Sequence, residues 1–191
     1  MMNYYSRASI RLKGYDYAAD GFYFLTICTY QKRYLFGHIQ NGNMILNDAG
    51  HTVLDCWKTI PDYFPNTRIH EFVVMPNHVH GIMEFFGDTD VDVSGVRAKS
   101  FSPLRVGDIS VPFQSPSKTV GSVVRGFKTG VTKWFRQHQS NRFPIGTPVW
   151  QRNYYEHIIC NEQAYRNIVN YIINNPKNGR KINSIPNNSC S

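Results

Sequence analysis

The sequence of 191 residues is 41% hydrophobic and 14% aromatic, and 21 basic against 13 acidic side chains give it a formal net charge of +8. These values fit a single globular domain over residues 1–191 and exclude an intrinsically disordered chain. Because no stretch approaches the roughly 18 consecutive apolar residues of a membrane helix and the N-terminus lacks a signal peptide, we expect a cytoplasmic protein with no membrane partner.

The positive charge is concentrated in the second half of the chain. Residues 1–96 contain 7 Lys and Arg against 10 Asp and Glu, whereas residues 97–191 contain 14 against 3. Clustered Lys and Arg side chains gain affinity for a polyanion because they release its counterions. The charge distribution therefore favours a nucleic-acid partner, with a basic surface that only keeps the protein soluble as the alternative.

The first half of the chain predicts strands on either side of one helix. Residues 22–29 are rich in aromatic and β-branched side chains, and residues 44–46 follow a turn-prone Asn-Gly-Asn sequence. The next segment predicts a helix over residues 47–63, with Asn47 as its N-cap. Residues 69–86 predict two strands separated at a Met-Pro-Asn sequence, because proline cannot donate to a central ladder.

The second half predicts two helices after a long loop. Residues 87–117 are rich in Gly, Ser, Asp and Pro without a sustained period, and predict a mobile loop insertion. An apolar stripe with helical spacing runs over residues 117–139. A last helix begins at the N-cap Asn161 and ends near Pro176, and a flexible tail is expected over residues 180–191.

The order of these elements predicts the fold class. Strands and helices are mixed without the regular alternation of a parallel sheet, which indicates an α+β fold. We expect an antiparallel sheet of the ferredoxin-like or RRM-like kind, with helices packed on one face.

Two histidines form the first candidate site. His78 and His80 are two residues apart on a predicted strand, so their Cβ atoms lie on one face roughly 6.5–7 Å apart, while Val79 points into the opposite layer. Two such imidazoles can converge on one cation. Surface or hydrogen-bonded histidines are the commoner alternative, and a metal site needs a third ligand, for which the same strand face offers Glu84.

The last helix carries the second candidate site. Tyr171 and Asn175 are four residues apart, so their side chains lie on adjacent turns of one helix face. They suit a nucleophile beside a metal ligand, or equally a packed tyrosine beside a polar residue at the helix end. Tyr165 projects about 240° away around the helix and cannot share the direction of Tyr171.

Five blocks of the sequence resemble the single-tyrosine transposases of simple insertion sequences, and above all the REP-associated tyrosine transposases. The histidine–hydrophobic–histidine (HUH) signature of that family is similar to FVVMPNHVHGIM. Its opening strand, first helix, basic helix and C-terminal signature are similar, in chain order, to RLKGYDYAADGFYFLTICT, LNDAG, VVRGFKTGVTKWF, and VWQRNYYEHII followed by YIINNP. The blocks together cover most of residues 11–178.

This resemblance implies a nuclease and strand transferase that cuts and rejoins single-stranded or hairpin DNA through a covalent 5′-phosphotyrosine, in DNA transposition. By position, Tyr171 matches the nucleophile, and His78 and His80, on a central strand, match the metal pair. Asn175 matches the third ligand, which is a glutamine in the insertion-sequence enzymes. Two imidazoles and an amide oxygen suit Mg²⁺ or Mn²⁺. A homodimer and an association with the nucleoid are further expectations.

Basic and aromatic side chains predict the DNA-binding surface. Such side chains hold single strands by contacting phosphates and stacking on unpaired bases. The candidates are Arg125, Lys128, Lys133, Arg136, Trp150, Gln151 and Arg152. Two other functions remain open at this stage: a domesticated hairpin DNA-binding protein without turnover, and a metal-dependent phosphodiester hydrolase that uses water as its nucleophile.

Overall fold

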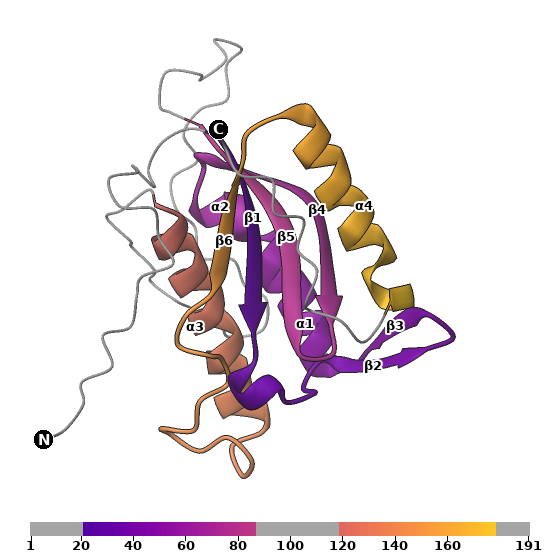
Figure 1. Cartoon of the computed structure of the whole chain (residues 1–191). Helices are drawn as coiled ribbons and strands as arrows, with labels where there is room; N and C mark the ends of the chain where they lie inside the picture. Colours follow the sequence, from indigo (N-terminus) through magenta and orange to yellow (C-terminus); the bar gives the residue numbers. More distant parts are fainter. Residues whose placement is uncertain (1–20, 87–118, 179–191) are drawn as a thin grey trace, which may run out of the picture.

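The structure is a computed structural model that describes residues 21–86 and 119–178 (Figure 1). Its elements are β1 Gly21–Cys28, the 3₁₀ turn η1 Tyr30–Lys32, β2 Gly37–Gln40, β3 Asn43–Leu46, α1 Asp48–Lys58, α2 Ile60–Tyr63, β4 Thr67–Met75, β5 His78–Phe85, α3 Val120–His138, β6 Tyr155–Ile159 and α4 Glu162–Asn178. Within those two ranges, none of the helices has the length and apolar character needed to cross a membrane. The predicted loop over residues 87–117 and the predicted tail lie outside the described residues.

Four antiparallel strands form the main sheet, in the order β4-β5-β1-β6. The predicted α+β class and antiparallel sheet are confirmed. β5 is a central strand, because β4 pairs with one of its edges and β1 with the other, so His78 and His80 lie on a central strand as predicted. The hairpin that joins β4 to β5 turns at Pro76 and Asn77, where the sequence predicts the break.

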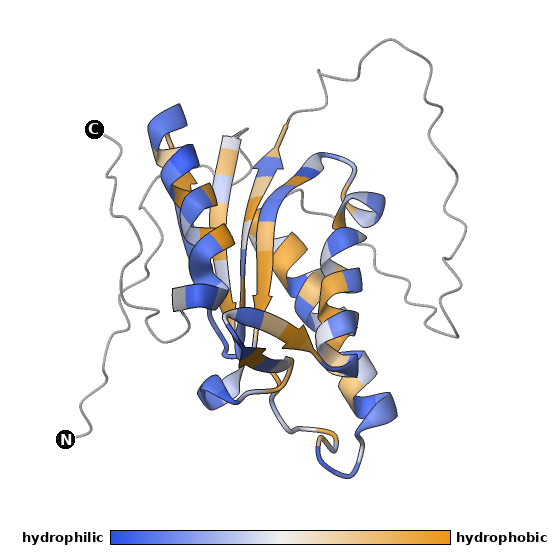
Figure 2. Cartoon of the chain, turned by 90° about the vertical axis from the view of Figure 1, so that its right-hand side faces the viewer, coloured by the Kyte–Doolittle hydropathy of each residue, from blue (hydrophilic) through white to orange (hydrophobic). Residues whose placement is uncertain are grey.

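Helices cover both faces of this sheet. On one face, α1, α2 and α3 pack over a large core that includes Tyr23, Leu25 and Trp57. On the other face, α4 packs over a smaller core made of Phe24, Ile82, Ile159, Ala164, Ile168 and Ile172. Figure 2 shows the hydrophobic strands between α4 and the remaining helices. The sequence predicts helices on one face, whereas the alternation of apolar residues along β1, such as Tyr23 and Phe24, makes both faces of the sheet apolar.

Two asparagines cap helices as predicted. The Asn47 side chain accepts a hydrogen bond from the Gly50 N–H at 2.9 Å, at the start of α1. The Asn161 side chain accepts one from the Ala164 N–H at 2.8 Å, at the start of α4. Each cap satisfies a backbone donor that the first helical turn leaves without a partner.

Other helix boundaries differ from the prediction. The helix expected over residues 47–63 is divided at Thr59, because Pro61 has no N–H to continue the ladder from α1 into α2. α3 begins after the N-cap Thr119, later than expected. Pro176 lies inside α4, which continues to Asn178, since a proline near a helix end interrupts only one backbone hydrogen bond.

Two strands of the structure were not predicted. β2 pairs with β3 across a turn in which Asn41 and Gly42 both have positive φ, the conformation of a two-residue hairpin turn. β6 forms the edge of the main sheet next to β1. Its sequence contains Tyr155, Ile158 and Ile159, which favour strands, but its place in the sheet depends on pairing with β1, more than a hundred residues earlier.

Candidate active site

His78 and His80 converge on the sheet face that α4 covers. Their ring centroids lie 4.5 Å apart, and both side chains are buried, at 4% and 0% exposure. The strand alternation is as predicted, because Ile82 lies in the α4 core whereas Val79 and Met83 lie in the opposite core. The two imidazoles therefore stand side by side in a protected environment.

A neighbouring side chain fixes one ring nitrogen of each histidine. His78 Nδ1 lies 2.6 Å from the Asn77 Oδ1, an amide oxygen that can only accept, so Nδ1 carries the proton and Nε2 keeps a lone pair. That Nε2 atom is buried without a hydrogen-bond partner among the described residues. His80 Nδ1 lies 2.8 Å from the hydroxyl oxygen of Thr26, the residue paired with it on β1. Metal-binding histidines are oriented by such contacts to their second nitrogen.

Burial keeps both imidazoles neutral at pH 7. It lowers the pKa of His78 to about 4, with a smaller contribution from the charge of Lys32. It lowers the pKa of His80 well below its usual value, and the neighbouring His78 adds to this effect. Neutral imidazole is the form that binds a metal ion, so both rings have the protonation state that metal binding would require.

α4 brings Tyr171 and Asn175 to the same place. The Tyr171 hydroxyl lies 3.2 Å from His80 Nε2, and the Asn175 side chain, which is 9% exposed, hydrogen-bonds the same hydroxyl. Burial raises the pKa of Tyr171, and the bond from Asn175 opposes that rise. The four residues predicted as nucleophile and metal ligands therefore form one cluster.

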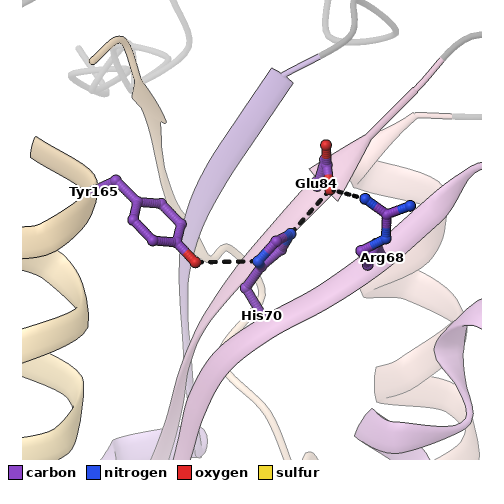
Figure 3. Close-up of polar contacts among 4 residues, drawn as sticks. All are labelled: Arg68, His70, Glu84 and Tyr165. Atoms are coloured by element: carbon purple, nitrogen blue, oxygen red, sulfur yellow. Dashed lines mark hydrogen bonds and ion pairs between the residues drawn. The ribbon is translucent and has the colours of Figure 1, made fainter. Parts of the chain in front are cut away.

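Glu84 lies in a different cluster. Its carboxylate contacts Arg68 and His70, and the hydroxyl of Tyr165 contacts the same His70 (Figure 3). Within the described ranges, no third His, Cys, Asp or Glu joins a pair of such side chains to form a metal-binding group. Asn175 is thus the polar side chain of α4 that lies in the cluster of the two histidines, whereas the Tyr165 hydroxyl contacts His70.

The predicted basic residues line one groove. Arg125, Lys133, Arg136 and Arg152 border a groove of about 730 Å³ along α3, together with Lys128 and Tyr154. α3 packs on the sheet face opposite to α4 (Figure 1). This groove and the histidine pair therefore lie on different faces of the sheet. A nucleic acid that reaches both would pass around an edge of the sheet.

Lys128 differs from the other basic residues of the groove. Its ammonium group donates hydrogen bonds to the backbone carbonyls of Gln151, Arg152 and Asn153, at 2.9, 3.4 and 3.2 Å. Burial lowers its pKa to about 8. Lys128 therefore holds the segment before β6 against α3, a role that its sequence position does not reveal.

Trp150 is a core residue and not an exposed stacking platform. It is 7% exposed and lies between Phe36 and Phe127, with ring centroids 5.3 and 5.5 Å away. Its indole N–H donates to the Lys128 carbonyl at 3.2 Å. The predicted stacking of an unpaired base on Trp150 is wrong for this arrangement, because the protein already covers both faces of the ring. Gln151 uses its backbone in a bond to the Cys28 carbonyl and is not among the residues that border the groove.

The chain is similar in sequence to a bacterial protein and in structure to a transposase. No family model matches the chain. An uncharacterized protein of Haemophilus influenzae is 50% identical over 170 residues, which cover 89% of this chain and 88% of that protein. The structure of a REP-associated tyrosine transposase bound to a REP hairpin aligns with a TM-score of 0.52 and 19% identity, over 90% of this chain and 75% of that one. The chain therefore belongs to the same family as the Haemophilus influenzae protein, and it shares its fold with the REP-associated tyrosine transposase.

Proposed function

We propose that the protein is a transposase that cuts and rejoins single-stranded or hairpin DNA, with Tyr171 as its nucleophile and a divalent metal ion as its cofactor. One observation supports this function most strongly. The buried His78 Nε2 presents a lone pair without a partner among the described residues, next to a second imidazole that contacts the Tyr171 hydroxyl. If the two histidines had only a structural role, the free-energy cost of burying this Nε2 atom without a hydrogen bond would have no compensation.

The donor set fits Mg²⁺ or Mn²⁺. His78, His80 and the side-chain oxygen of Asn175 would hold the ion. A structural zinc site usually includes cysteine thiolates, and none belongs to this set among the described residues. When bound, such a cation polarises the scissile phosphate and neutralises the charge that develops on it. The Asn77 and Thr26 contacts keep both imidazole rings in a fixed orientation for this task.

Tyr171 supplies the reactive oxygen. Its Oη forms a bond to phosphorus, the bond from phosphorus to the 3′ oxygen breaks, the phenolic proton leaves, and the 3′ oxygen takes up a proton. The phosphotyrosine conserves the energy of the phosphodiester, so a free 3′ hydroxyl can reverse the step and join a new strand. Burial between α4 and the sheet raises the pKa of Tyr171, so the hydroxyl is protonated at neutral pH before the reaction.

The DNA partner is supported by charge and by the structural neighbour. That neighbour is a transposase bound to a REP hairpin. In this chain, Arg125, Lys133, Arg136 and Arg152 border one groove, which suits the phosphates of a DNA backbone. We propose that the groove holds the stem or flank of the DNA while the single strand reaches Tyr171 on the other face. A homodimer and a location at the nucleoid belong to the same proposal.

Covalent capture tests this function. The protein is incubated with a library of single-stranded and hairpin oligonucleotides and Mn²⁺, denatured in detergent, and the attached DNA is sequenced. The wild type should become attached to a defined subset, whereas Tyr171→Phe should bind the same DNA without attachment. Tyr63→Phe is the control, since it removes a hydroxyl from α2 on the opposite sheet face, and it should still become attached.

The two alternative functions give different results in this experiment. A hairpin-binding protein without turnover would bind DNA, and neither the wild type nor the control would become attached. A hydrolase that uses water would release cut DNA without attachment and would keep cutting in Tyr171→Phe. Either result would contradict the proposed role of Tyr171.

A further inference from the structure

A second polar cluster lies on the α4 face of the sheet, and we call Arg68, His70, Glu84 and Tyr165 the Glu84 cluster (Figure 3). Glu84 Oε2 lies 3.0 Å from Arg68 Nη1 and 3.0 Å from His70 Nε2. The other ring nitrogen, His70 Nδ1, lies 3.1 Å from the Tyr165 hydroxyl. Three elements, β4, β5 and α4, contribute to this chain of hydrogen bonds.

Strand alternation places Arg68 and His70 of β4 on the sheet face of Glu84. Arg68 pairs with Glu84 across the ladder, but the register shifts between Ile69 and Phe72. His70 is two residues after Arg68 and therefore faces α4, while the extra residue in this bulge turns Phe72 to pack against Trp57 in the opposite core. Bulges of this kind re-aim side chains and are frequent next to functional sites.

The proton positions in the Glu84 cluster follow from its carboxylate. An ionised carboxylate can only accept, so His70 donates through Nε2 and keeps a lone pair on Nδ1, to which the Tyr165 hydroxyl donates. The second carboxylate oxygen of Glu84 takes no hydrogen bond from the described residues, and in Figure 3 it points away from both partners. The Arg68 side chain is 66% exposed. The cluster thus presents a fixed acceptor beside an accessible cationic donor.

Aromatic rings surround these polar groups. Phe22 packs edge-on against His70 and Tyr165, with ring centroids 5.1 and 5.5 Å away. The guanidinium carbon of Arg68 lies 5.5 Å from the centre of the Phe86 ring. Aromatic rings next to an arginine are the usual means by which proteins hold the bases and phosphates of a single strand.

The Glu84 cluster lies close to the candidate active site on the same sheet face. Tyr165 is six residues before Tyr171 on α4, which corresponds to about 9 Å along the helix. Glu84 is four residues after His80 on β5, which corresponds to about 13 Å along the strand. If the scissile phosphate of a DNA single strand lies at Tyr171, a nucleotide only a few positions along that strand would lie at the Glu84 cluster.

We infer that the Glu84 cluster is a subsite that selects one unpaired nucleotide near the scissile phosphate, favouring a base with an exocyclic amino group. Glu84 accepts from that amino group, and Arg68 donates to a ring or carbonyl acceptor beside it or to the adjoining phosphate. His70 and Tyr165 are positioning residues that hold the carboxylate in place. This inference rests on the proposed function, because it assumes that a single strand lies along the α4 face.

Binding selection followed by abasic substitution tests the subsite. A randomised 20-nucleotide single-stranded library is selected for binding to Tyr171→Phe, which is not expected to turn over, and the best-enriched oligonucleotide is made with each base in turn replaced by an abasic site. Removing the base read by the cluster should weaken binding about five- to 150-fold, as expected for loss of one stacked base at about 1–3 kcal/mol. The same abasic penalty should shrink to less than half when Arg68→Gln or Glu84→Gln is added.

Glu71→Gln is the matched control, because Glu71 is an exposed carboxylate in the same bulge of β4, and it should keep the full abasic penalty. Arg68→Gln changes an exposed side chain and keeps the test informative if Glu84→Gln lowers the thermal stability. Abasic penalties that are identical with and without Arg68→Gln would overturn the subsite while leaving the proposed function intact. A protein that binds no single-stranded oligonucleotide at all would instead contradict the proposed function.

Discussion

The contact between Tyr171 and His80 makes a prediction about metal affinity. His80 Nε2 lies 3.2 Å from the Tyr171 hydroxyl, and the same nitrogen would have to bind the metal ion. One imidazole lone pair cannot serve both partners, so the ion must compete with the hydroxyl for His80. We therefore expect Tyr171→Phe, which removes the hydroxyl and keeps the ring, to bind Mn²⁺ more tightly than the wild type.

The size of the effect follows from the strength of that hydrogen bond. A neutral hydrogen bond contributes about 0.5–1.5 kcal/mol net, and about 1.4 kcal/mol corresponds to a tenfold change in a dissociation constant. The Mn²⁺ dissociation constant of Tyr171→Phe should therefore fall about two- to tenfold.

Isothermal titration of the DNA-free protein with Mn²⁺ at pH 7.5 measures this change. Tyr165→Phe is the control, because its hydroxyl contacts His70 and not the metal pair, and its dissociation constant should equal that of the wild type. An unchanged affinity in Tyr171→Phe would refute the competition. A weaker Mn²⁺ affinity in Tyr171→Phe would mean that the hydroxyl is itself a metal ligand. Unchanged Mn²⁺ binding in His78→Ala would mean that His78 is not a metal ligand.

Three further predictions concern charge and stability. Replacing Arg136 and Arg152 by glutamine should flatten the dependence of log affinity on log salt for a single strand by about 1.4, at about 0.7 per phosphate contact, as measured by fluorescence anisotropy, and an unchanged slope would place the DNA elsewhere. Lys128→Met should lower the free energy of unfolding by about 1–3 kcal/mol in urea titrations, because three backbone carbonyls lose their donor, whereas the exposed Arg136→Gln should change it by less than about 0.5 kcal/mol. The pKa of His78 is about 4 in the folded state and about 6.5 in the unfolded state, so between these pH values only the unfolded state takes up the proton. The free energy of unfolding of the metal-free protein should therefore decrease as the pH falls from 6.5 to 4, by up to about 3 kcal/mol, and His78→Leu should reduce that decrease.

The parts of the fold that the sequence predicts are those with local causes. Asn47 and Asn161 cap helices because their side chains reach a backbone N–H three residues later. The break between β4 and β5 follows from Pro76, which has no N–H for a ladder. The shared face of His78 and His80 follows from strand alternation alone. Each of these features depends on a few neighbouring residues, so the sequence contains enough information to predict it.

The features that the sequence does not predict depend on distant contacts. Trp150 stands in a basic and aromatic run that is typical of a DNA-binding surface, yet Phe36 and Phe127 enclose it from elements far away in the chain. The sequence predicts Lys128 to be one of several DNA-binding cations on a basic helix, but its ammonium group donates to the backbone carbonyls of residues 151–153. Glu84 shares a strand face with His80, and only the pairing of β4 with β5 brings Arg68 and His70 to its carboxylate. Tertiary packing decides these three cases.

The covalent bond to Tyr171 is the central claim, and peptide mapping measures it most directly. The protein that has reacted with single-stranded DNA and Mn²⁺ is digested with nuclease and protease, and the peptides are analysed by mass spectrometry. We expect a nucleotide mass on the peptide that contains Tyr171, located by fragmentation on that residue, and none in Tyr171→Phe. A nucleotide mass on Tyr154, Tyr155 or Tyr165, or an adduct that persists in Tyr171→Phe, would contradict the account.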